Sequence, residues 1–251
     1  MAYTHAPTPA DRGGVGLYPR RWSRAAAVVL LVLLPSDVDA SGQELAVLKP
    51  RDLLVAGPKA FIELLEATRP SPVSVEEMGM ILRTLPPQGE VTALGDPARQ
   101  KVQSVRQLLT ATRRDWYEIK VIDVPQATIA LYARSVVLIS APAIAQLAAA
   151  ELQAMVAHEI GHEYVWSEWN RAGQRADQER LKELELVCDA IAAVILHQLG
   201  MDPSKLMDGL EKVGRFNRQR LGEAGNEKSY PTLDERRAFA RRIWRWLRDS
   251  S

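Results

Sequence analysis

The sequence predicts an α+β fold that is mostly helical, with a small β-sheet beside the helix that carries two closely spaced histidines. Three observations lead to this prediction. Long stretches repeat apolar residues at helical spacing, one short region has the alternation and β-branched composition of strands, and helical patterns then resume. A chain of 251 residues is also long enough to bury one sizeable core.

The first forty residues have the composition of an export signal. Arginines precede an apolar run from Ala25 to Leu34, Pro35 ends the run, and small residues lead up to Ser41. Ten apolar residues are fewer than the roughly 20 that a bilayer-spanning helix needs, so a cleaved signal is favoured over a membrane anchor. We therefore expect residues 1–40 to be a signal peptide of an exported protein, periplasmic or extracellular, with membrane association left open.

Residues 41–115 read as a helical lead-in to the domain that follows. Ser74 with Glu77 three positions later forms a capping-box pattern, which marks the start of a helix. Asp96 is the expected N-cap of the next helix because Pro97 suits a first helical turn.

The region 117–140 predicts two or three strands of a small sheet. Tyr117, Ile119 and Val121 fall on one side of the first run, and Pro125 separates it from a second run rich in β-branched and aromatic residues. We expect the strand around Val136 to Ile139 to lie beside a cleft, where an extended peptide could add as a further strand.

Helical patterns resume at Ala141 and continue, with a stop signal at Gly200 and Pro203, into an amphipathic C-terminal helix. The arginines and tryptophans of this last helix could rest on an anionic membrane surface as a peripheral contact. A helix that docks its tryptophans on the domain is the favoured alternative.

Two histidines four positions apart, His158 and His162, lie on one of the predicted helices, with Glu159 directly after the first. Residues four apart share a helix face, with Cβ atoms about 5–6 Å apart, so both imidazoles could bind one Zn²⁺ ion. Glu159 lies about 100° round the helix, where it is poorly placed as a ligand but could act as general base on a metal-bound water. The helix is strongly apolar, and imidazoles against a core need partners, which favours this interpretation over a solvated pair.

A catalytic zinc site needs a third protein ligand and an open position for water. Glu185 and Asp189 are spaced by four on a later helix, so Glu185 could complete the ligand set while Asp189 orients a ligating histidine. The alternative is a charged stripe, since the preceding residues are dense with charge. The apolar run from Leu186 to Leu196 argues against a charged stripe, because acidic side chains within or beside such a run are expected to have a specific role.

Four segments, in order, resemble the HtpX and CAAX-prenyl-protease type of gluzincin metallopeptidases, metallopeptidase family 48. They are "DVPQATIALYARSVVLIS", "AAAELQAMVAHEIGHE", "ELVCDAIAAVILHQLGMDP" and "SYPTLDERRAFARR", which together cover roughly half of the chain. The resemblance implies a zincin-like domain over residues 116–251, of the soluble exported bacterial type. It also implies one Zn²⁺ per chain and assigns the following roles: ligands His158, His162 and Glu185, catalytic base Glu159, supporting acid Asp189, and Arg236 at the family's arginine.

The chain departs from the family pattern in two places. His162 and Glu185 are separated by only 23 positions (185 − 162), closer than is usual, which implies a more open cleft. Tyr230 stands where the family has a histidine. Its hydroxyl could donate a hydrogen bond to a developing oxyanion, or it could be a packing residue, and both readings stay open.

The expected activity is therefore zinc-dependent endopeptidase action on peptides or unfolded proteins, with Arg236 and Tyr230 stabilising the oxyanion. Near-equal numbers of acids and bases, 31 and 32, give no electrostatic case for a nucleic-acid partner. Two alternatives remain: an inactive metallopeptidase-like scaffold or chaperone-type binder, and a zinc-free helical protein at the membrane. Nearby, Glu163 is expected to be solvated or capping, and Cys188 to be a small buried hydrophobe.

Overall fold

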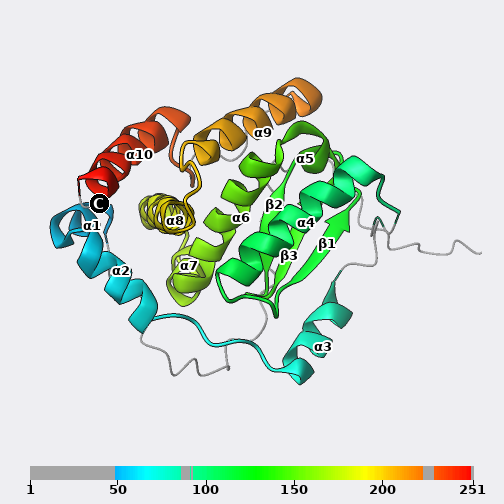
Figure 1. Cartoon of the computed structure of the whole chain (residues 1–251), viewed down its shortest axis with the longest axis horizontal. Helices are drawn as coiled ribbons and strands as arrows, with labels where there is room; N and C mark the ends of the chain where they lie inside the picture. Colours follow the sequence, from blue (N-terminus) through cyan, green and yellow to red (C-terminus); the bar gives the residue numbers. More distant parts are fainter. Residues whose placement is uncertain (1–48, 86–90, 92, 223–228, 250–251) are drawn as a thin grey trace, which may run out of the picture.

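The computed structural model describes residues 49–85, 91, 93–222 and 229–249, so the predicted signal peptide lies outside the described residues. Within them the fold is mostly helical with one three-stranded sheet, as the sequence predicts (Figure 1). The helices are α1 (Pro50–Ala56), α2 (Pro58–Ala67), α3 (Val75–Thr84), α4 (Asp96–Ala111), α5 (Ala141–Gln146), α6 (Ala149–Tyr164), α7 (Trp166–Gln174), α8 (Gln178–Gln198), α9 (Lys205–Leu221) and α10 (Leu233–Arg248). The strands are β1 (Glu118–Ile122), β2 (Ile129–Tyr132) and β3 (Val136–Ser140).

The sheet has the order β1-β3-β2, with β3 parallel to β1 and antiparallel to β2. Every residue of β3 is buried, as expected for a strand that is covered on both faces. The prediction that a peptide could add beside Val136 to Ile139 is wrong, because β1 and β2 already pair with both edges of β3. The strand of this sheet that packs against α6 is the edge strand β2.

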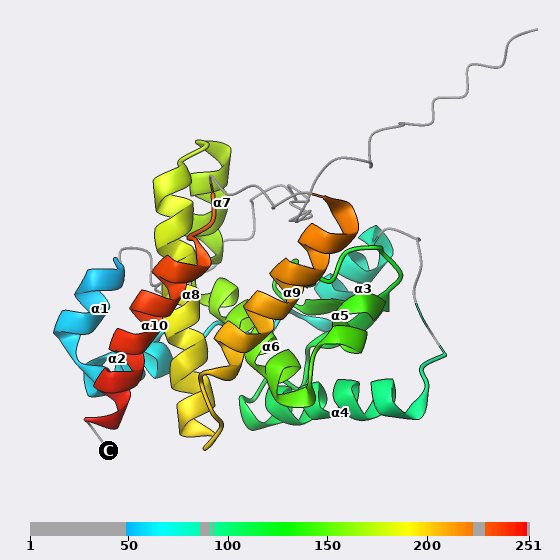
Figure 2. The same ribbon diagram turned by 90° about the horizontal axis from the view of Figure 1, so that it is seen from above.

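Helix α6 is central to the packing. It contacts β2, α4, α8 and α9; α4 and α8 lie on opposite sides of it (Figure 1), and α9 crosses over it (Figure 2). The helices of the predicted lead-in pack into the same hydrophobic core as the later helices. Leu53 of α1, Phe61 of α2 and Val105 of α4 belong to one buried cluster that also contains Ile160 and Ile191. The two helices that carry the predicted metal ligands, α6 and α8, therefore pack against several other elements.

Most helix boundaries follow the local signals in the sequence. Ser74 accepts a hydrogen bond from the Glu77 N–H and the Glu77 carboxylate accepts one from the Ser74 N–H, which confirms the capping box. Gly200 adopts φ +67° just after α8, a left-handed conformation that favours glycine and ends the helix. The prediction for Asp96 is wrong by one residue, because Gly95 is the N-cap and Asp96 is the first helical residue.

The C-terminal helix α10 docks on the domain, as the favoured alternative predicts. Ile243 and Leu247 are buried, and the Trp246 ring lies 6.0 Å from the Phe61 ring of α2. Its outer face carries the exposed arginines Arg241, Arg242, Arg245 and Arg248. Contact of this face with a membrane stays a prediction. Among the described residues, no helix combines the length and the apolar character that crossing a bilayer requires.

A buried ion pair joins the end of α4 to the end of α6. The Arg114 Nε donates to Glu163 Oε2 at 2.9 Å, and both side chains are almost fully buried. The prediction that Glu163 is solvated or capping is therefore wrong. Sequence alone could not show this, because the partner lies 49 positions away.

Glu163→Ala is expected to destabilise the fold by about 3–5 kcal/mol, because it leaves the Arg114 guanidinium buried without its counter-charge. Glu63→Ala is the matched control, since Glu63 pairs with Lys59 at 4.0 Å on the surface. Such exposed pairs contribute about 0–1 kcal/mol. The free energy of unfolding in urea measures both effects, and equal small losses would show that the buried pair is not structural.

Candidate metal centre

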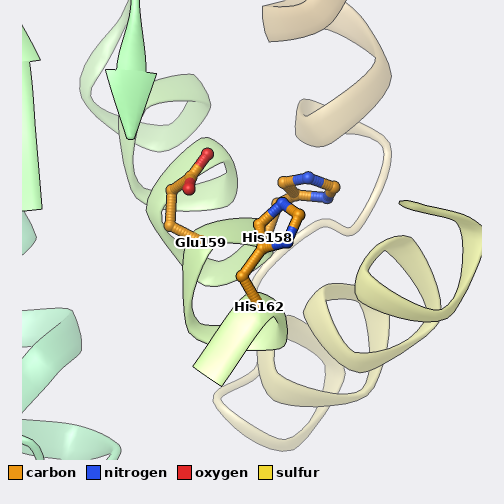
Figure 3. A group of neighbouring side chains, drawn as sticks. All are labelled: His158, Glu159 and His162. Atoms are coloured by element: carbon orange, nitrogen blue, oxygen red, sulfur yellow. The ribbon is translucent and has the colours of Figure 1, made fainter. Parts of the chain in front are cut away.

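Two helices bring the predicted site residues together. Helix α6 carries His158, Glu159 and His162, and α8, which packs directly on it, carries Glu185 and Asp189. Figure 3 shows the two imidazoles extending from one side of α6 while the Glu159 carboxylate points elsewhere. The i, i+4 spacing thus places both histidines on one face, as the sequence predicts.

The Glu185 carboxylate lies between the two imidazoles. Its Oε2 is 3.3 Å from His158 Nε2, and its Oε1 is 3.5 Å from His162 Nε2. Ligand atoms bound to one tetrahedral Zn²⁺ at about 2.0–2.1 Å would lie roughly 3.3–3.4 Å apart. Each of these two distances, one to each Glu185 oxygen, is close to that spacing, and two imidazoles with one carboxylate form a donor set typical of catalytic zinc sites.

Asp189 fixes the orientation of His158. Its Oδ1 lies 2.9 Å from His158 Nδ1, so an N–H at Nδ1 donates to the Asp189 carboxylate and Nε2 is the ring nitrogen that faces Glu185. Arg236 holds the carboxylate from the other side, with Nε 2.8 Å from Asp189 Oδ2 and Nη2 2.5 Å from Oδ1. Another nitrogen, Nη1, lies 3.3 Å from Glu185 Oε2.

The ionisable side chains of this buried group shift one another's pKa values. Burial disfavours a charged His158, but the charge of Glu185 and the hydrogen bond to Asp189 outweigh burial and raise the pKa of His158 to about 10. For Glu185 the charge of His158 outweighs burial and lowers the pKa to about 2. Burial lowers the pKa of His162 to about 4. Two carboxylates thus face the single guanidinium of Arg236, and a proton on His158 supplies the charge that a metal ion would bring.

Glu159 is the alternative third ligand, since donor atoms of His158, Glu159 and His162 lie within 4.8 Å of one another. We favour Glu185 because its two oxygens lie 3.3 Å and 3.5 Å from the imidazole nitrogens, close to the spacing of zinc ligands. The Glu159 carboxylate instead accepts a hydrogen bond from the Leu131 N–H of β2 at 2.9 Å. Burial raises the pKa of Glu159 to about 7, which suits a group that exchanges protons near neutral pH.

Tyr230 and Arg236 both come close to the centre. Tyr230 is half-buried just before α10, and burial together with the charges of Glu185 and Glu159 raises the pKa of its hydroxyl, which therefore keeps its proton. Arg236 is 6 % exposed and all its guanidinium nitrogens face Asp189, Glu185 or His158. The roles of both residues in stabilising an oxyanion stay predictions.

Two residues that support the site were missed in the sequence. Gly161 lies between the histidines, where an added Cβ would come within 2.7 Å of the Cys188 Cα, so only glycine allows this approach of α6 to α8. A glycine inside a helix usually has a packing reason, and Gly161 could have been recognised on this ground from the sequence. The Trp169 ring of α7 packs edge-on against His162, with the ring centroids 4.6 Å apart. Cys188 is fully buried, as predicted.

No protein-family model matches this chain, and no curated protein matches it either. The resemblance to the family 48 gluzincins therefore depends on the four sequence segments alone. The convergence of the two imidazoles and the Glu185 carboxylate is a feature of the structure that does not depend on that resemblance.

Proposed function

We propose that this protein is a zinc-dependent endopeptidase of zincin-like fold, related to the HtpX and CAAX-prenyl-protease type of family 48 gluzincins. The observation that carries the proposal is the position of the Glu185 carboxylate, 3.3 Å and 3.5 Å from the Nε2 atoms of the two imidazoles. Its substrates would be peptides or unfolded proteins. We also propose export, on the composition of residues 1–40 alone.

His158, His162 and Glu185 would hold the metal. A bound Zn²⁺ supplies Lewis acidity, which lowers the pKa of a coordinated water toward about 7 and polarises a peptide carbonyl. Glu159 takes the proton from the attacking water and passes it to the leaving amine, a task for which its raised pKa is suited. Leu131 holds the Glu159 carboxylate in place between these transfers.

Arg236 and Tyr230 would act differently from each other. The guanidinium of Arg236 is committed to Asp189 and Glu185, which supports a role in positioning the ligands. Tyr230 carries a protonated hydroxyl close to the charges of Glu185 and Glu159, which supports its role as the donor to a developing oxyanion.

The alternative is a scaffold that holds the metal without cleaving peptides. Its one structural support is that the Glu159 carboxylate is bonded to Leu131 and does not face the imidazoles (Figure 3). A chain that binds zinc but cleaves no unfolded protein would favour this alternative.

Purified protein is expected to contain one zinc ion per chain and to cleave casein, an unstructured protein. Removal of the metal with a chelator should abolish cleavage, and zinc should restore it. Glu185→Ala should lose both zinc and cleavage, because the two imidazoles alone do not complete the ligand set. Elemental analysis and a casein assay measure these quantities.

Glu179→Ala is the matched control for Glu185→Ala, since Glu179 is an exposed glutamate in the first turn of the same helix. It should keep the zinc content and activity of the wild type. Wild-type protein without stoichiometric zinc, or with cleavage that chelation leaves unchanged, would contradict the proposed function.

A further inference from the structure

The outer edge of β2 lies beside the candidate metal centre, and only some of its backbone groups are hydrogen-bonded. The Ser140 N–H donates to the Thr128 carbonyl, so Thr128 faces β3. The backbone N–H and carbonyl groups of successive residues in a strand point alternately to its two edges. The backbone groups of Ala127, Ile129 and Leu131 therefore point away from β3. These residues form the edge along which a further strand could pair.

Asn217 of α9 already occupies one end of this edge. Its Oδ1 accepts from the Ala127 N–H at 2.8 Å, and its Nδ2 donates to the Ala127 carbonyl at 2.9 Å. One donor and one acceptor on the same residue are what a neighbouring strand would supply. The side-chain amide therefore takes the place of a paired strand at Ala127.

Leu131 lies at the other end of this edge, and its N–H donates to Glu159, the proposed general base. Ile129 lies between the two ends. Among the described residues, neither its outward N–H nor its outward carbonyl has a hydrogen-bond partner. The unpaired part of the edge thus begins at Ile129 and runs toward the candidate metal centre.

We propose that Asn217 ends the substrate-binding edge of β2, so that a bound peptide pairs with Ile129 and with the Leu131 carbonyl but not with Ala127. This inference rests on the proposed endopeptidase function. A peptide antiparallel to β2, the direction in which β2 itself pairs with β3, runs from Leu131 toward Ala127. The end of the edge that Asn217 occupies, at Ala127, therefore lies on the C-terminal side of the cleaved bond. A bound peptide can form strand hydrogen bonds with β2 over only a few residues after that bond.

Asn217→Ala tests this proposal through the length of the substrate. Two peptides share one cleavage site and carry two or five residues after it. In the wild type the longer peptide should gain nothing in KM, because Asn217 holds the Ala127 groups. In Asn217→Ala the released groups can pair with it, so its KM should fall on the order of tenfold while kcat stays the same, the effect of one or two added hydrogen bonds.

Gln219→Ala is the matched control, because Gln219 is an exposed amide on the same helix. It should leave the ratio of the two KM values as in the wild type. Asn217→Asp keeps the acceptor for the Ala127 N–H and loses the donor to its carbonyl, so its ratio should be intermediate. A loss of stability in Asn217→Ala with an unchanged KM ratio would mean that Asn217 only anchors the loop, and would overturn the proposal.

Binding of the same two peptides, labelled with a fluorophore, separates this proposal from the proposed function. It is measured by anisotropy on zinc-treated Glu159→Gln protein with and without Asn217→Ala. If neither the wild type nor Asn217→Ala cleaves the peptides, but the double variant binds the longer one more tightly than Glu159→Gln does, the peptidase function fails and the role of Asn217 is supported. If the double variant shows no length dependence, or binds neither peptide, the proposal for Asn217 fails.

Discussion

Glu159→Gln is expected to slow the cleavage of casein by about 10²–10⁴-fold, the usual contribution of a general base, while zinc content stays at one ion per chain. Glutamine has nearly the same shape, and its amide oxygen can still accept the hydrogen bond from the Leu131 N–H. It cannot accept a proton from water. The metal should remain because its proposed ligands are His158, His162 and Glu185.

Glu151→Gln is the matched control for this substitution. Glu151 is also a buried glutamate on α6, but it lies two turns before His158 and pairs with Lys212 at 2.6 Å. Its loss should leave cleavage close to that of the wild type. Casein cleavage at equal rates by wild type and Glu159→Gln would end the assignment as a peptidase, whatever the zinc content.

Residues that share an element were predictable, because helix and strand periods place them without tertiary information. The spacing of His158 and His162 is enough to put both imidazoles on one face of α6. The spacing of Glu185 and Asp189 does the same on α8. That the two faces meet could be inferred only from the chemistry, since an apolar helix that carries acids needs partners for them.

Features that depend on contacts between distant segments were not predictable in this way. The strand region was predicted with two or three strands, but the order of the strands was not, because strand alternation does not say which neighbour a strand pairs with. The helix expected to run on from Ala141 is interrupted at Leu147, where the backbone is extended. The bond from Asn217 to Ala127 spans 90 positions and has no local signal.

Gly161→Ala is expected to lose both stability and zinc affinity. The added Cβ would lie 2.7 Å from the Cys188 Cα, 2.9 Å from its Cβ and 3.0 Å from its carbonyl oxygen. Two of these are backbone atoms, so the clash is relieved only if α6 and α8 move apart. Overpacking of this kind costs about 1–3 kcal/mol or more, which unfolding in urea would measure.

The loss of zinc affinity follows from where the clash lies. Gly161 is between the two histidines on α6, and Cys188 is between Glu185 and Asp189 on α8, so any separation of the helices widens the gap that the metal must bridge. Gly173→Ala, in the last turn of α7 with nothing within 4 Å, should bind zinc normally and gain up to about 1 kcal/mol of stability. If Gly161→Ala kept wild-type zinc affinity in competition with a chelator, the convergence of the ligands would not depend on the close approach of the two helices.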